Sequence, residues 1–183
     1  MTLSDIAGYC PEKAIWKMLV DVTGYYLGKE PLSRIGPECV VIAGEVFLTV
    51  PRDTTDHHFM APEADGQQNP AQTEIVWSIG ALIYYASTGR ILFGGHGGSY
   101  QRQHPTVSLP VLPKTHQSLT PIMQRCLCDT ASKRICMEEL NEEAKRGLLA
   151  CSNRKRKVML AEKEPDEVMA QSQVCWPEEM KEV

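Results

Sequence analysis

The segment Glu74–Ser87, with the sequence EIVWSIGALIYYAS, is apolar on almost every side of the helix that its length and composition predict. Such a helix must be covered by other elements over most of its surface. Gly89 follows it as a stop signal. The sequence therefore predicts a mainly α-helical domain built around this central helix, with Trp77 in its core.

The elements expected around the central helix follow from apolar spacing. Residues from Pro11 onward repeat at intervals of three and four, which predicts a helix that Gly24 and Gly28 end. Two β-prone runs, Cys39–Ala43 and Val46–Val50, are separated by Gly44-Glu45 and predict a small β-hairpin.

The rest of the chain alternates between irregular stretches and helices. We expect a loop over 51–69, an irregular stretch with one short helix over 90–115, and helices over 119–127 and 134–149. The chain has 183 residues, which fits one domain over residues 1–150 and a charged, disordered or frayed tail over 151–183.

Charge and cysteine content exclude several classes of function. The 19 Lys and Arg residues against 23 Asp and Glu give a net charge of −4, which provides no field to hold nucleic acid. The apolar run Ala14–Val20 is interrupted by Lys17, so no membrane span is expected and a cytoplasmic location is predicted. The seven cysteines lack the paired spacing of a zinc site, so we expect reduced thiols, no metal and no cofactor.

Four short motifs occur in a fixed order along the chain. They are Met60-Ala-Pro-Glu63, Ile75-Val-Trp-Ser-Ile-Gly80, Thr88-Gly-Arg-Ile-Leu-Phe93, and Arg125-Cys-Leu followed by Arg134. In this order and spacing, the set resembles the C-terminal lobe of a protein kinase, with its A-P-E motif, central W-S-x-G helix and late arginine. The resemblance covers residues 11–150.

The resemblance implies a structural ion pair between Glu63 and Arg134, which would tie the segment around Pro62 to the helices. Breaking a buried pair of this kind costs about 3–5 kcal/mol. Without the surrounding motifs, two unrelated exposed charges would be the default interpretation.

The catalytic positions of a kinase are not matched by catalytic residues. The alignment sets Pro31-Leu-Ser33 at the H-R-D motif, Glu38 at the metal-binding asparagine and Val50-Pro-Arg52 at D-F-G. A hydroxyl does not replace the catalytic carboxylate, and valine does not hold magnesium. The chain also starts too late to include an N-lobe, so we expect no catalytic residue and no enzyme.

A kinase C-lobe without catalytic residues resembles the KIND domain, the kinase non-catalytic C-lobe fold. Thr2–Ile6, Ile15-Trp16 and Ile35-Gly-Pro37 are similar to the opening of that family, with Gly36 where serine is usual. KIND domains are protein-binding modules, and one docks a basic formin tail on an acidic groove. The resemblance implies a non-catalytic scaffold for a peptide of a cytoskeletal or signalling partner.

The function, the charge of the partner and the role of the basic run at 154–157 each allow more than one interpretation. As alternatives to a scaffold, the chain is a nucleotide-binding pseudokinase fragment or atypical phosphotransferase, or an inert product of gene truncation. The partner is expected to be a protein or peptide with a basic character, because residues 1–50 carry six acidic and four basic side chains. The basic run Arg154–Lys157 fits either an import or membrane-surface signal or, preferably, charges that complement a helix end.

Overall fold

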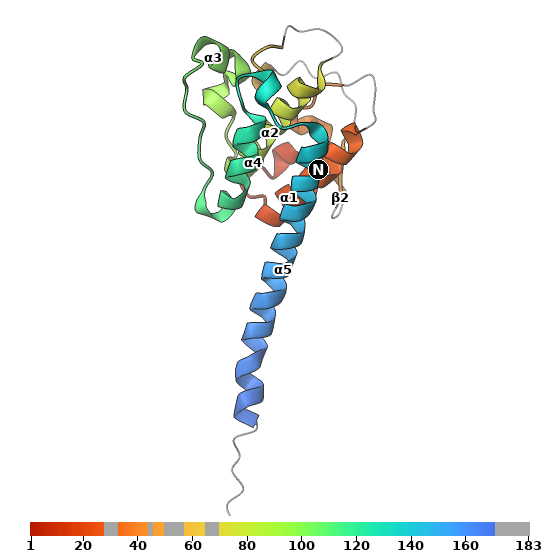
Figure 1. The fold of residues 1–183 in the computed structure, drawn as a ribbon. Coiled ribbons are helices and arrows are strands. Elements are labelled where there is room, and N and C mark those ends of the chain that lie inside the picture. Colours follow the sequence, from red (N-terminus) through yellow and green to blue (C-terminus); the bar gives the residue numbers. More distant parts are fainter. Residues whose placement is uncertain (28–32, 44–45, 50–56, 65–69, 171–183) are drawn as a thin grey trace, which may run out of the picture. The chain divides into compact units, whose positions relative to one another are not determined.

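The central helix is α2, Gln72–Thr88, in the computed structural model (Figure 1). The model describes residues 1–27, 33–43, 46–49, 57–64 and 70–170, with the backbone alone at Val46, Leu48 and 155–170. The interior of α2 is buried from Ile75 through Ile83. The helix ends at Gly89, which has a left-handed backbone with φ 68°. The mainly helical class predicted from this segment is confirmed, and the KIND fold remains a proposal.

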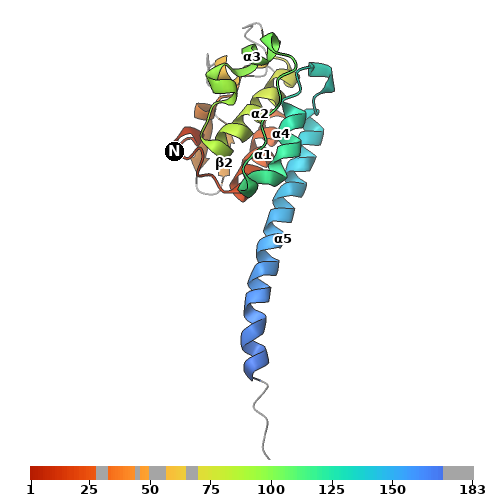
Figure 2. The ribbon, with the colours of Figure 1, turned by 90° about the vertical axis from the view of Figure 1, so that its left-hand side faces the viewer.

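The contacts of the chain divide it into two units, Met1–Leu148 and Leu149–Val183. In the first unit α2 packs against α1 and α4 (Figure 2). The helices are α1 (Glu12–Tyr26), α2, α3 (Gly97–Gln103), α4 (Thr120–Cys126) and α5 (Met137–Ala170), of which the first unit holds α5 up to Leu148. Short 3-10 turns join them at Leu3–Asp5, Pro37–Cys39, His57–Phe59, Leu92–Gly95, Lys114–Leu119 and Ala131–Lys133.

Close packing between α2 and α4 depends on Gly80. A Cβ atom at this position would lie 2.7 Å from Cβ of Cys126 and 2.9 Å from Cγ of Leu127. The two helices therefore approach each other more closely than any side chain at position 80 would permit.

The predicted hairpin is formed by β1 (Val40–Ala43) and β2 (Val46–Thr49), which pair antiparallel with Val40 opposite Thr49. Its turn, Gly44-Glu45, lies outside the described residues. Strand β2 packs on α1. The backbone N–H of Phe47 donates to the carboxylate of Asp21 at 3.0 Å, so a charged side chain of α1 holds the strand.

Helix α5 begins at Met137, three residues later than the sequence predicts. Arg134 has extended backbone at φ −68° and ψ 153°, so it precedes α5 and is not part of the helix. In the first turns Met137, Leu140 and Ala144 are fully buried and lie on one face. Asn141 donates to Oγ1 of Thr23 at 2.7 Å, which joins this face to α1.

The second unit, Leu149–Val183, contains the segment for which the sequence predicts a disordered or frayed tail, and the structure describes it up to Ala170. Its backbone is helical from Leu149 to Ala170, as the continuation of α5. Glu, Lys, Ala, Met and Leu are frequent in this stretch, and all five favour a helix even where they do not pack in a core. Charge therefore indicated an exposed segment, while intrinsic propensity gives it helical backbone. Residues 171–183 lie outside the described residues.

Candidate functional site

The predicted ion pair is present, and Arg134 is its buried member. The guanidinium of Arg134 makes a two-point contact with the carboxylate of Glu63, with Nη2 at 2.8 Å from Oε2 and Nη1 bonded to Oε1. The side chain of Arg134 is 0% exposed, whereas that of Glu63 is 35% exposed. The pair that the resemblance implies as buried is therefore buried on one side only, because water reaches Glu63 and does not reach Arg134.

Every N–H group of the Arg134 guanidinium has an acceptor. Besides Glu63, its hydrogens are accepted by the carbonyl of Cys128 at 2.7 Å, that of Thr73 at 3.1 Å and that of Asp129 at 3.2 Å. The arginine thus joins three parts of the chain: the start of α2, the segment that follows α4 and the segment that contains Glu63. A guanidinium with all five donors satisfied tolerates burial.

Trp77 and Pro62, the two core residues named from the sequence, are both buried. Trp77 is 0% exposed, and its indole N–H donates to Gln101 at 2.9 Å. Gln101 in turn donates to the carbonyl of Leu127 at 2.8 Å, so a buried polar chain links α2 to α3 and α4. Pro62 is buried, and its carbonyl accepts from Nε of Arg102 at 2.5 Å.

The positions aligned with kinase catalytic residues are partly described. Pro31 and Val50 lie outside the described residues. The carbonyl of Ser33 accepts from the hydroxyl of Tyr26 at 2.9 Å. The carboxylate of Glu74, near the start of α2, lies 3.6 Å from the guanidinium of Arg34, the residue after Ser33. This pair joins α2 to the segment aligned with the catalytic loop.

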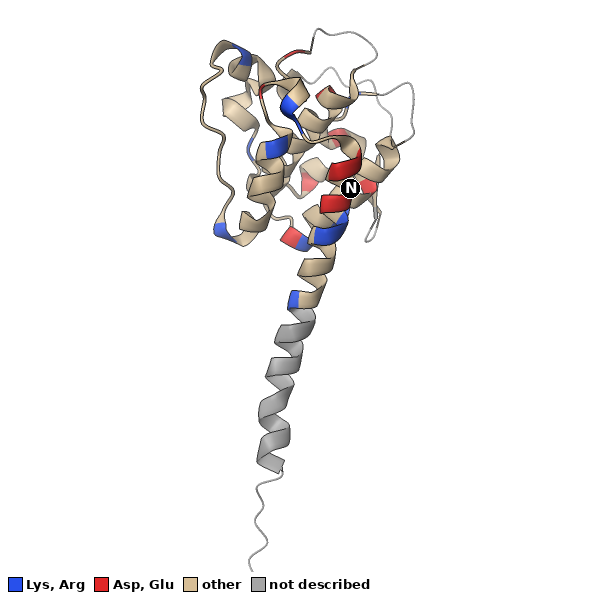
Figure 3. Ribbon diagram, viewed as in Figure 1, with Lys and Arg blue, Asp and Glu red and all other residues tan. Residues whose placement is uncertain are grey.

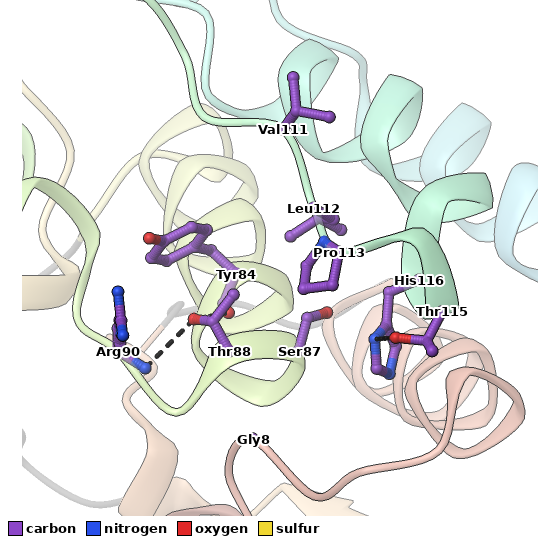
Figure 4. Close-up of a pocket in the computed structure, with 10 residues that line it drawn as sticks. All are labelled: Gly8, Tyr84, Ser87, Thr88, Arg90, Val111, Leu112, Pro113, Thr115 and His116. Carbon is purple, nitrogen blue, oxygen red and sulfur yellow. Dashed lines mark hydrogen bonds between the residues drawn. The ribbon is translucent and has the colours of Figure 1, made fainter.

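A pocket of about 590 Å³ opens at the C-terminal end of α2 (Figure 4). Three stretches far apart in the sequence form it: the loop before α1, the last turns of α2, and the segment that leads to α4. Its lining residues are Gly8, Tyr84, Ser87, Thr88, Arg90, Val111, Leu112, Pro113, Thr115 and His116. The volume lies within the range of pockets that take small molecules or peptide side chains.

The imidazole of His116 is fixed by two neighbours. Its Nε2 lies 2.8 Å from the carbonyl oxygen of Cys10, and its Nδ1 lies 2.9 Å from Oγ1 of Thr115. A carbonyl only accepts, so Nε2 is the donor to Cys10. Both ring nitrogens of His116 therefore have a partner within the first unit.

Ser87 lies at the wall of the same pocket and is 4% exposed. Its Oγ has no hydrogen-bond partner among the described residues. The lining residues that the structure describes include no Asp or Glu. The pocket thus places a buried, unpaired hydroxyl among neutral polar, basic and apolar groups.

Metal binding finds no support in the described part of the chain. No group of three or more His, Cys, Asp and Glu side chains gathers there in a way that could hold an ion. The adjacent rings of His57 and His58 lie 4.2 Å apart and tilted, with no third ligand beside them among these residues.

No protein-family model matches the chain, and no curated protein matches it either. Over the residues that the structure describes, none of the helices has both the length and the apolar character needed to span a membrane.

The sequence did not reveal the pocket. Of its lining residues, only Thr88 and Arg90 belong to one of the four motifs in the sequence. The missing partner of Ser87 depends on how 111–116 packs over α2, which no local pattern records.

Proposed function

We propose that this chain is a non-catalytic protein-interaction module of KIND-like type, which docks a peptide of a cytoskeletal or signalling partner in the cytoplasm. The observation that carries the proposal is the two-point contact between Arg134 and Glu63. The kinase-lobe resemblance named both residues. Their pairing across 71 positions supports the resemblance, and with it the function that the resemblance implies.

The packing of the segment Met60–Glu63, which ends at the ion pair, also supports this proposal. The backbone N–H of Gly98 donates to the carbonyl of Met60 at 3.1 Å, and a Cβ at Gly98 would lie 2.5 Å from the backbone of Ala61. The start of α3 is thus pressed against the segment that ends in Glu63. This contact supports the proposed resemblance to a kinase lobe, in which the A-P-E segment is tied to the helices.

The acidic residues counted in the sequence do not by themselves favour a basic partner, because three of them already have partners within the chain. Asp5 accepts hydrogen bonds from Thr2, Asp21 pairs with Lys17, and Glu12 accepts from Ser118. Helix α5 carries acidic side chains in its first turns (red in Figure 3), but basic residues of the same unit lie beside them. The ion pairs there are Arg125 with Glu139 and Glu143, Lys145 with Glu142, and Arg146 with Glu143.

A selection from a random 12-residue peptide library tests the proposed function. The immobilised full chain is the bait, and the same matrix without protein is the control. Selected peptides are then synthesised and titrated into the full chain by calorimetry. We expect saturable binding at one peptide per chain. If no peptide binds saturably to a chain that is folded by circular dichroism, the interaction function is rejected.

A further inference from the structure

The pocket at the end of α2 contains a buried hydroxyl that lacks a hydrogen bond. Ser87 Oγ belongs to a side chain that is 4% exposed, and none of the described residues donates to it or accepts from it. Buried polar groups in proteins are paired almost without exception. An oxygen atom of a ligand bound in the pocket beside Ser87 would give this hydroxyl the hydrogen-bond partner that it lacks.

A positive charge at the rim indicates the kind of ligand. The backbone N–H of Arg90 donates to Oγ1 of Thr88 at 3.1 Å, which fixes the start of the turn (Figure 4). The guanidinium of Arg90 has no ion pair with any described residue, and none of the pocket's lining residues is acidic. A guanidinium presents parallel donors that suit a carboxylate. The pocket therefore favours a carboxylate over a cation.

The opposite wall is apolar. Val111 is 68% exposed, and Leu112 and Pro113 continue the same wall down to Ser87 (Figure 4). An exposed valine beside a pocket offers apolar surface that a ligand can bury. The ligand that fits this surface carries an apolar group beside its carboxylate.

The backbone next to Val111 favours a peptide over a small molecule. Residues 107–113 have no regular secondary structure. Within the described chain, the backbone N–H groups of Ser108, Leu109 and Val111 make no hydrogen bond to the protein. An extended peptide uses such free backbone groups by pairing alongside them. Pro110 and Pro113 limit this pairing to a few residues.

We propose that the pocket lined by Ser87, Arg90 and Val111 binds an extended peptide segment of the partner that carries a carboxylate beside an apolar side chain. The carboxylate bonds to the guanidinium of Arg90, an oxygen of the peptide bonds to Ser87, and the apolar side chain packs on Val111. This inference rests on the proposed interaction function. It assigns the partner an acidic and apolar segment, the opposite charge to the basic peptide that the KIND resemblance implies.

The peptides selected on the full chain test the site. Binding is measured by fluorescence polarisation to wild type, Arg90→Glu, Val111→Asp and Lys114→Glu. The last variant reverses a charge in the same stretch at a residue that does not line the pocket. We expect selected peptides with Asp or Glu beside an apolar residue, and affinity at least about tenfold lower for Arg90→Glu and Val111→Asp. Lys114→Glu should stay within about twofold of wild type.

Ser87→Ala separates a ligand contact from a fold defect. Because Ser87 Oγ has no partner among the described residues, this variant should keep the melting temperature of wild type and bind the peptides several-fold more weakly, on the order of threefold or more. Equal affinity for Ser87→Ala and wild type contradicts the hydrogen bond assigned to this hydroxyl and overturns the proposed binding geometry.

Two results overturn the pocket while the interaction function stands. One is the selection of basic peptides whose affinity does not change in Arg90→Glu and Val111→Asp. The other is an acidic peptide that binds all four proteins equally. If N-acetyl-leucine, a small apolar carboxylate, binds as tightly as the peptides, the occupant is a small molecule and the peptide proposal is rejected. Failure of every peptide to bind rejects both this inference and the proposed function.

Discussion

The buried guanidinium of Arg134 and the half-exposed carboxylate of Glu63 form a two-point ion pair that closes a span of 71 positions in the chain. This asymmetry in burial decides which member of the pair matters more for stability. Arg134 also serves three backbone carbonyls, whereas Glu63 borders solvent.

Arg134→Ala is expected to lower the free energy of unfolding by about 3–5 kcal/mol, because three carbonyls lose their donor, at about 1–3 kcal/mol for each that water does not reach. Glu63→Gln should cost less, about 1 kcal/mol, since the amide oxygen still accepts and water reaches the site. Urea unfolding measures both changes.

The exposed pair between Arg125 and Glu139 supplies the control, and Arg125→Ala should cost less than about 1 kcal/mol. Equal midpoints for the Arg134 and Arg125 variants would contradict the anchoring role of Arg134.

Two glycines in helices should respond in opposite ways to alanine. At Gly80 a Cβ meets Cys126 at 2.7 Å, so Gly80→Ala forces α2 and α4 apart at a cost of about 1–3 kcal/mol. At Gly24, in α1, a Cβ meets nothing within 4 Å, so Gly24→Ala should stabilise by about 0.5–1 kcal/mol through helix propensity. Thermal unfolding of both variants gives the comparison, and a stabilising Gly80→Ala would refute the close packing.

The cysteines of the first unit should differ in reactivity. Cys10 and Cys126 are buried, and burial raises their thiol pKa values from 9.0 to about 11 and about 12. Cys136 is exposed. Iodoacetamide at pH 8 should therefore label Cys136 and spare the other two in the folded protein. Peptide mass spectrometry detects the labels, and rapid labelling of Cys126 would rule out its burial.

The same two thiols predict a loss of stability in alkali. In the folded state they hold their protons more tightly than in the unfolded chain, so their contribution is complete below pH 9 and is lost as the pH rises toward 11 and 12. The free energy of unfolding should fall with pH in this window, and less steeply in Cys126→Ala measured relative to its own value at pH 8. An identical slope in the two proteins would show that Cys126 does not titrate in this way.

The sequence predicted those parts of the fold that depend on local pattern. The apolar run Ile75–Ile83 required a buried helix, and the alternation of β-prone runs with Gly44-Glu45 indicated two paired strands. The Glu63–Arg134 pair was predicted from a motif resemblance. Its unequal burial was not, because exposure depends on how neighbouring segments cover each side chain.

Local sequence patterns do not predict the pocket, and in the second unit they point in two directions. The pocket is formed by Gly8, the last turns of α2 and the stretch at 111–116, and its free hydroxyl exists only once these meet. In the second unit, high charge favours disorder while the residues that carry it favour helix. The structure describes helical backbone up to Ala170.

Ligand-induced thermal shift of the full chain tests the central claim, that this chain binds a peptide and does not use nucleotide. A selected peptide and Mg-ATP are titrated in parallel over the same range of concentrations. Because a ligand that binds the folded state stabilises it by mass action, the account predicts a saturable rise in melting temperature with the peptide and no change with Mg-ATP. A saturable rise with Mg-ATP and none with the peptide would contradict the account and favour a nucleotide-binding pseudokinase fragment.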